Sequence, residues 1–165
     1  MTATATTTTT PPRLEAWVSF LRAHAAITRA LNADLLNEHG LTLNDYEVLL
    51  HLSRAEDGMM RRVDLAESVL LTASGITRLL DGLERAGFVE KRSCKSDARV
   101  SYAKLTPAGS AKLAAAAQTH VAGIEELFTG RFSAEEIATL GELLARLPMT
   151  GRDCAGSGPA ACGPA

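Results

Sequence analysis

Residues 62–105 decide how the rest of the chain is interpreted. Their sequence is RVDLAESVLLTASGITRLLDGLERAGFVEKRSCKSDARVSYAKL. The pattern predicts a short helix over 62–69, a turn at 69–71, and a second helix that Thr72 caps at its N-terminus. Gly87 suits the left-handed position that ends such a helix. Two helices joined by a tight turn are therefore expected.

Apolar spacing predicts which face of each helix is buried. In the first helix the expected buried face consists of Val63, Leu65, Ala66 and Val69. In the second helix it consists of Ile76, Leu79, Leu80 and Leu83. Beyond Gly87, residues 88–92 and 100–105 are expected to be strands, and the basic loop 93–99 joins them.

The opposite face of the second helix is polar and carries the residues that suggest a function. Hydroxyls lie near its N-terminus and a guanidinium follows one turn later; this face holds Ser74, Thr77, Arg78, Asp81 and Arg85. Such a helix can enter the major groove of DNA with its N-terminus first. Free N–H groups and hydroxyls then bind phosphates, and arginine can pair with guanine.

Charge separates this region from the rest of the chain. Residues 71–105 hold seven positive and four negative side chains, a net charge of +3, whereas the whole chain has −2 and the remainder therefore −5. A basic module within an acidic chain indicates that a polyanion binds there.

The stretch LLTASGITRLLDGLERAGFVEKR, the motif Asp97-Ala98-Arg99 and the segment LTPAG that follows resemble the MarR (multiple antibiotic resistance regulator) family of bacterial transcription factors. The resemblance spans about 14–147. It implies a mainly α fold with a small antiparallel β-wing, a winged helix-turn-helix with N- and C-terminal dimerisation helices. The sequence departs from the family at Gly82, where a long side chain is usual, and in the wing, where proline is common.

The resemblance also assigns roles to residues. The helix 72–86 would be the recognition helix, Asp97 would brace the wing, and Arg99 would enter the minor groove. Together with the polar face described above, the expected DNA-binding residues are Thr72, Ser74, Thr77, Arg78, Lys95, Asp97 and Arg99.

The flanking sequence predicts the domain organisation. We expect a flexible threonine-rich arm over 1–11, a winged helix-turn-helix with dimerisation helices over 12–147, and a disordered glycine- and proline-containing tail over 148–165. The DNA-binding core is about 42–105. Helices are predicted over 12–38, from a capping box at Thr42 to about residue 54, from Thr106 to about 128, and after a capping box at Ser133. A short third strand is predicted at 59–61.

The first helix has more apolar surface than one small domain needs to cover. One stripe consists of Trp17, Phe20, His24, Ile27, Leu31 and Leu35, and a second of Leu14, Val18, Leu21 and Ala25. Packing against a second copy of the chain is the simplest cover, and the resemblance implies the same homodimer. It also implies a small aromatic or phenolic effector bound between the dimer helices and the winged domain. The candidate ligand-binding residues are Trp17, Phe20, His24, Tyr46 and His51.

Composition and motifs argue against several other classes of protein. The chain is 46% hydrophobic and 22% charged, which are globular values, and only 4% aromatic, which disfavours stacking platforms for single-stranded nucleic acid. No sequence motif of an enzyme, no pair of histidines at metal-ligand spacing and no cofactor motif is present, so we expect neither catalysis nor a bound metal or cofactor. No apolar run approaches the roughly 18 residues of a membrane span, and the N-terminus lacks the features of a signal peptide. A cytoplasmic location is therefore expected.

Two alternatives belong to other functional classes. Cys94 lies among Lys91, Arg92 and Lys95, and nearby cations favour the reactive thiolate, so the chain could be a thiol-based redox sensor. It could also be a small-molecule-binding protein that does not bind DNA, although the basic face at Arg78, Lys95 and Arg99 argues against this.

Overall fold

The computed structural model describes residues 11–69, 71–93 and 100–148. These residues form six α-helices, two short 3-10 helices and three strands. In chain order the elements are α1 (Pro12–His39), α2 (Leu43–Arg54), η1 (Glu56–Gly58), β1 (Met59–Arg61), α3 (Arg62–Ser68), α4 (Ala73–Arg85), β2 (Val89–Ser93), β3 (Ser101–Leu105), α5 (Pro107–Leu127), η2 (Thr129–Arg131) and α6 (Ala134–Leu144).

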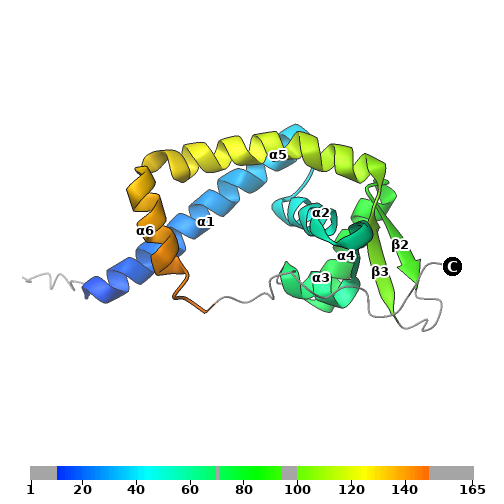
Figure 1. Ribbon diagram of the computed structural model, residues 1–165, viewed down its shortest axis with the longest axis horizontal. Helices are drawn as coiled ribbons and strands as arrows, with labels where there is room; N and C mark the ends of the chain where they lie inside the picture. Colours follow the sequence, from blue (N-terminus) through cyan, green and yellow to red (C-terminus); the bar gives the residue numbers. More distant parts are fainter. Residues whose placement is uncertain (1–10, 70, 94–99, 149–165) are drawn as a thin grey trace, which may run out of the picture.

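The two long helices connect two ends of the molecule (Figure 1). Helices α1 and α5 pack against each other, and α5 also contacts α2. At one end α2, α3, α4 and the sheet form a compact group, while α6 lies at the other end. The mainly α fold with a small antiparallel sheet is the predicted one.

Local signals in the sequence set the ends of the helices. Gly40 ends α1 in the left-handed conformation (φ 64°), which suits a residue without a Cβ. Thr42 and Asp45 form the predicted capping box of α2. Thr106 caps α5 by accepting from Gly109 N at 3.0 Å, and Ser133 opens α6 with a second capping box.

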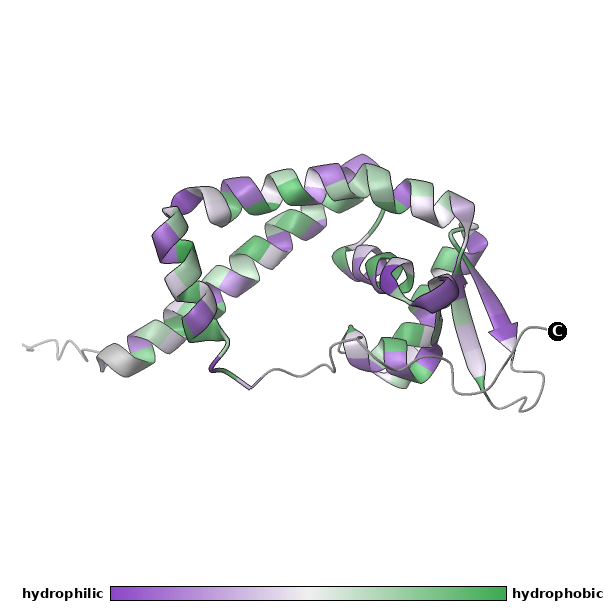
Figure 2. Ribbon diagram, viewed as in Figure 1, coloured by the Kyte–Doolittle hydropathy of each residue, from purple (hydrophilic) through white to green (hydrophobic). Residues whose placement is uncertain are grey.

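The three strands form one antiparallel sheet in the order β1-β3-β2. Ala103 in the central strand pairs with Met60 on one side and with Lys91 on the other. The predicted third strand at 59–61 is thus confirmed, and it forms the edge of the sheet opposite β2. The outer strand β2 is hydrophilic over most of its length (Figure 2).

The core lies between the compact group and the parts of α1 and α5 that pack on it, and it fixes the orientation of α4. The largest fully buried side chains are Leu35, Val48, Leu49, Leu52, Leu65 and Leu80. The predicted stripe of α4 is confirmed: Ile76, Leu80 and Leu83 are buried, and Leu79 is half-buried against the same core. Its opposite face is therefore held outward.

Close contacts and polar bonds join α1 to α5. A Cβ on Gly123 would lie 2.7 Å from Leu31 Cδ2, so the α5 backbone at Gly123 lies directly against the Leu31 side chain. The Thr119 hydroxyl donates to Glu38 Oε2 at 2.7 Å and lies 2.8 Å from His39 Nε2. These contacts hold α5 along the second half of α1.

The prediction for Val63 is wrong, because its side chain is 64% exposed. Each residue turns an α-helix by about 100°, which places Val63 well off the face that Leu65, Ala66 and Val69 share. In α2, Val48 and Leu52 are fully buried.

The first half of α1 is largely exposed within the single chain. Trp17 is 56% exposed and Phe20 42%, whereas Leu31 and Leu35 further along the same stripe are buried. The predicted arm 1–11 lies outside the described residues apart from Pro11, and the predicted tail 148–165 apart from Pro148.

Candidate nucleic-acid interface

The N-terminus of α4 presents two hydroxyls. Thr72 caps the helix, and its Oγ1 accepts from Gly75 N at 3.1 Å. Ser74 Oγ lies 3.2 Å from the same oxygen, and both residues are exposed. The first turn of α4 thus combines exposed hydroxyls with the positive end of the helix dipole.

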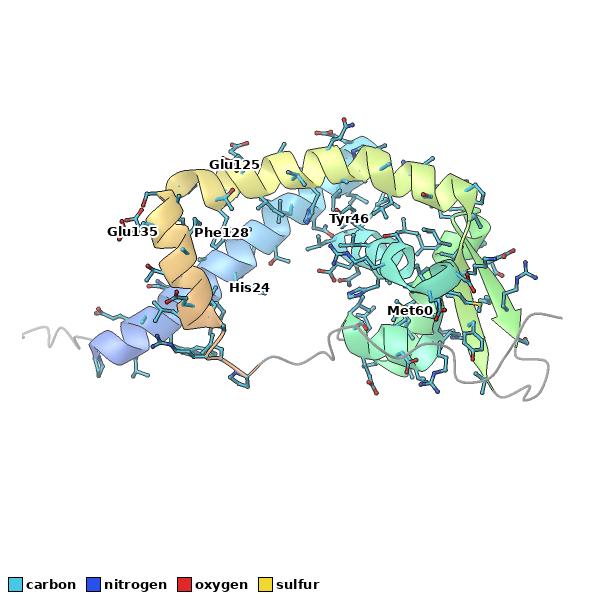
Figure 3. All side chains as sticks on the ribbon, in the orientation of Figure 1. His24, Tyr46, Met60, Glu125, Phe128 and Glu135 are labelled. Carbon is cyan, nitrogen blue, oxygen red and sulfur yellow. The ribbon has the colours of Figure 1, made fainter. Side chains whose placement is uncertain are left out.

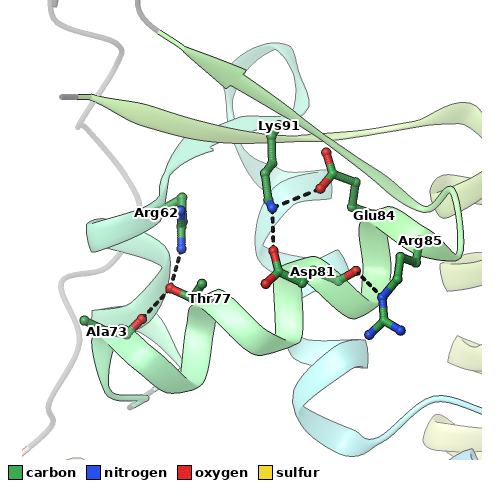
Figure 4. Close-up of polar contacts among 7 residues, drawn as sticks. All are labelled: Arg62, Ala73, Thr77, Asp81, Glu84, Arg85 and Lys91. Atoms are coloured by element: carbon green, nitrogen blue, oxygen red, sulfur yellow. Dashed lines mark hydrogen bonds and ion pairs between the residues drawn. The ribbon is translucent and has the colours of Figure 1, made fainter. Parts of the chain in front are cut away.

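Thr77, one turn further on, is already engaged in internal hydrogen bonds (Figure 4). Its hydroxyl donates to Ala73 O at 2.7 Å and accepts from Arg62 Nη2. Arg62 begins α3, so this contact joins the two helices. The sequence analysis did not select Arg62, because no helical spacing within α4 points to it.

Arg78 and Arg85 extend the polar face of α4. Arg78 is exposed. Arg85 is also exposed, and its Nε donates to Asp81 O at 3.1 Å (Figure 4). The buried stripe anchors the opposite face of α4. The Arg78 side chain therefore points to solvent, where it is free to contact DNA.

Part of the basic charge seen in the sequence is neutralised within the fold. Lys91 on β2 pairs with Asp81 and, at 3.0 Å, with Glu84. Arg92 pairs with Glu90 at 2.7 Å. The Lys91 ammonium donates to both carboxylates; its bond to Asp81 lowers the pKa of Asp81, and its bonds to Asp81 and Glu84 raise the pKa of Lys91.

The predicted wing residues Lys95, Asp97 and Arg99 lie outside the described residues, as does Cys94. The base of the wing is described. Beside it lies a hollow of about 570 Å³, lined by Arg61, Arg62, Val63, Ala66, Glu67, Leu71, Ala73, Ile76, Thr77, Val100 and Ser101.

The five candidate ligand-binding residues fall into two groups. Trp17, Phe20 and His24 stack in sequence along α1, with ring centroids 6.2 and 6.4 Å apart. Tyr46 and His51 lie on α2, in the compact group. Figure 3 shows His24 and Tyr46 at well-separated places in the molecule. A single chain does not bring the two groups together.

Tyr46 is buried against His120 of α5, with ring centroids 4.4 Å apart. Burial lowers the pKa of His120 and raises that of Tyr46. His120 Nδ1 is buried and has no partner among the described residues. The sequence analysis did not assign His120 a role, because only the packing of α5 on α2 brings it to Tyr46.

Burial also lowers the pKa of His51, with a smaller contribution from the charge of Arg54. No group of three or more metal-ligating side chains occurs within 11–69, 71–93 and 100–148. Within those same ranges, no helix has the length and apolarity needed to cross a membrane.

A recognition-type helix held beside a three-stranded wing sheet defines a winged helix-turn-helix protein, and comparison with known proteins gives the family. The sequence profile of the MarR family matches residues 39–100. The transcriptional repressor YetL of Bacillus subtilis is 34% identical over 114 residues, covering 67% of this chain and 68% of YetL. The chain belongs to the MarR family of transcriptional regulators, as its sequence resemblance predicted.

Solved structures agree with this assignment. AbsC, a MarR family regulator from Streptomyces coelicolor, matches with a TM-score of 0.76 at 32% identity, covering 82% of this chain and 91% of AbsC. Sco3205, a MarR family regulator from the same organism solved in complex with DNA, matches with a TM-score of 0.77 at 26% identity. That match covers 83% of this chain and 89% of Sco3205.

Proposed function

We propose that the protein binds a near-palindromic operator in duplex DNA and represses transcription. The observation that carries this proposal is the outward polar face of α4. Its exposed Ser74 and Arg78 lie opposite the buried stripe of Ile76, Leu80 and Leu83. An α-helix fits the major groove, and an arginine there can pair with the O6 and N7 atoms of guanine. The structure of Sco3205 with DNA supports the proposal.

We further propose that the binding unit is a homodimer. The apolar side chains exposed in the single chain include Leu14, Trp17, Phe20, Leu21, Phe132, Leu143 and Leu147. They lie on α1, on α6 and next to α6, a helix without a buried residue of its own. Apolar surface of this kind is stabilised by about 25 cal/mol per Å² when a partner covers it. A second copy would also supply a second recognition helix for a palindromic site.

A small effector would then act through the region between the dimer helices and the winged domain. The contact of Tyr46 with His120 supports placing the effector there, because it joins α2 of the winged domain directly to α5. One pocket can contain both groups of candidate residues only if they come from different subunits. The other subunit would then supply Trp17, Phe20 and His24 of α1, next to Tyr46 and His51 of α2. A phenolic ring could stack on such residues.

Selection of bound duplexes from a random pool tests the proposed DNA binding. We expect an inverted repeat with half-sites about one helical turn, roughly 10 bp, apart. Gel shifts should show an affinity that falls steeply with salt, because phosphate contacts release counterions. Repeating the shifts with phenolic compounds tests the effector, and a reporter gene tests repression. Recovery of random sequences with salt-independent binding would refute the proposal.

A further inference from the structure

The hollow at the base of the wing lies between the two elements that would touch DNA. Its walls come from α4, through Ala73, Ile76 and Thr77, and from the start of β3, through Val100 and Ser101. Its remaining lining comes from the turn before α4 and from the end of β1 with the following helix α3, which supplies the acidic Glu67 as well as Arg62.

This position matters if the protein binds DNA as proposed above, on which the inference rests. A recognition helix occupies the major groove while the wing reaches the adjacent minor groove. One sugar-phosphate strand separates two adjacent grooves, so that strand must cross the surface between helix and wing. In this chain that surface is the hollow.

Two arginines border the hollow, and they differ in their hydrogen-bond and ion-pair partners. Arg61 is paired with Asp64 through two bonds of 2.7 and 3.0 Å. Arg62 has no carboxylate at ion-pair distance among the described residues, and its Nη2 donates instead to the neutral hydroxyl of Thr77. Its Nε is buried and lacks a partner among those residues. Arg61 is held in an ion pair, whereas Arg62 acts on the nearby Asp81 carboxylate through its charge alone, without an ion pair among the described residues.

We propose that Arg62 binds a backbone phosphate of the strand that crosses the hollow. Hydrogen bonds between a guanidinium and a phosphate are charge-assisted and about twice as strong as neutral ones. A phosphate would therefore replace the Thr77 hydroxyl as the better acceptor. Thr77 would keep its own bond to Ala73 O at 2.7 Å, so the recognition helix would keep its local structure.

The decisive measurement is the salt dependence of operator binding for Arg62→Gln, with Arg61→Gln as the matched control. The plot of log K against log salt falls, and losing one phosphate contact makes it less steep by about 0.9. A dimer has one such contact in each subunit, so its slope should lose roughly 2 in steepness. We expect an affinity loss on the order of tenfold at moderate salt, with the base preference unchanged. Arg61→Gln should change the slope much less, because Asp64 already holds that guanidinium.

A second set of variants separates direct binding from a purely structural role. If Arg62 only positions Thr77, then Arg62→Gln should have no further effect in a Thr77→Val background. We expect instead that Arg62→Gln lowers the salt slope equally in both backgrounds, and that Arg62→Lys largely restores it. An unchanged slope in Arg62→Gln, or an effect that disappears in Thr77→Val, would overturn the proposal.

These outcomes differ from failure of the proposed function itself. If the unmodified protein binds no duplex, then operator binding fails before Arg62 is tested. If it binds and Arg62→Gln matches it at every salt concentration, then only the role of Arg62 fails. Thermal unfolding of each variant tests whether the fold is intact. A loss of affinity in a folded variant can then be assigned to the lost contact.

Discussion

Lys91 on the outer wing strand is paired with Asp81 on α4, and the same ammonium lies 3.0 Å from Glu84. Figure 4 shows the lysine reaching from β2 to two successive turns of α4. A basic residue of the wing is therefore used to tie the wing to the helix. Its charge is largely compensated before any DNA approaches.

This pairing predicts opposite effects for its two partners. Asp81→Asn removes a negative charge from α4, the helix proposed to face DNA, and releases Lys91, so operator affinity should rise at low salt. Lys91→Met leaves Asp81 and Glu84 uncompensated, so affinity should fall. Thermal stability should change little, because exposed ion pairs contribute little. Titration by fluorescence anisotropy at two salt concentrations would measure both; weaker binding by Asp81→Asn would contradict the prediction.

Arg78→Ala should change specificity rather than general affinity for DNA. Its side chain is exposed on α4 and lies one turn beyond Ser74. Loss of a bidentate contact with guanine costs about 1–3 kcal/mol and relaxes the preference at that base. The pool of selected duplexes should therefore degenerate at one position in each half-site. Arg92→Gln is the control, since Arg92 is paired with Glu90; an unchanged profile in Arg78→Ala would place the helix differently.

The sequence predicted most of the fold because its signals are local. Four helices begin at the N-cap residues that the sequence predicts, which are Thr42 (with Asp45), Thr72, Thr106 and Ser133. Val63 was assigned wrongly because a seven-residue helix has too few turns to define its buried face. Its i, i+3 spacing to Ala66 is that of a core position, although Leu65 and Val69 define a face well away from it.

The site was less predictable because its key contacts join segments distant in sequence. Arg62 meets Thr77 across 15 residues, and Lys91 meets Asp81 across 10. Counting charges along the chain cannot show that Lys91 and Arg92 form ion pairs while Arg62 forms none among the described residues. His120 meets Tyr46 only because α5 returns across α2.

Two glycines should respond oppositely to alanine. A Cβ on Gly109 would lie 2.1 Å from Phe88 O, which is backbone and cannot move aside easily, so Gly109→Ala should destabilise the fold by several kcal/mol. A Cβ on Gly82 would meet nothing within 4 Å. Gly82→Ala should stabilise α4 by about 0.5–1 kcal/mol, since glycine is a poor helix former. Chemical denaturation measures both; a stable Gly109→Ala protein would contradict the packing of α5 on the wing.

Stability should decrease on mild acidification, partly through His120. Burial lowers its pKa below the usual 6.5, so the unfolded chain binds more protons than the folded chain below about that pH. Stability is then lost as pH falls. His51 acts in the same direction, whereas Glu47, whose pKa burial raises from 4.5, acts oppositely at lower pH.

Replacing His120 by phenylalanine tests this linkage. The ring can still pack on Tyr46, but it no longer titrates. We expect the difference in melting temperature between pH 7.5 and pH 6 to be smaller in His120→Phe than in the unmodified protein. An identical difference in the two proteins would show that His120 does not contribute.

Charges placed on the exposed apolar side chains of α1 and α6 should separate the proposed dimer from the fold of each subunit. Trp17 is 56% exposed and Leu143 48% in the single chain. Trp17→Glu and Leu143→Glu should therefore leave the monomer folded, but place an uncompensated charge in an interface that buries them. Sedimentation should show monomers, and operator affinity should fall because linked half-sites no longer bind together.

Val63→Glu is the matched control, because Val63 is also a large apolar residue, 64% exposed, but lies on α3 beside the hollow. It should remain a dimer, so exposure and added charge alone would not explain dissociation of the other two. Its operator affinity should nevertheless fall, since the new carboxylate would lie near the crossing phosphates. Dimers of unchanged stability in both Trp17→Glu and Leu143→Glu would mean that the subunits pair through a different surface, and the spacing of the two recognition helices would then have to be set elsewhere.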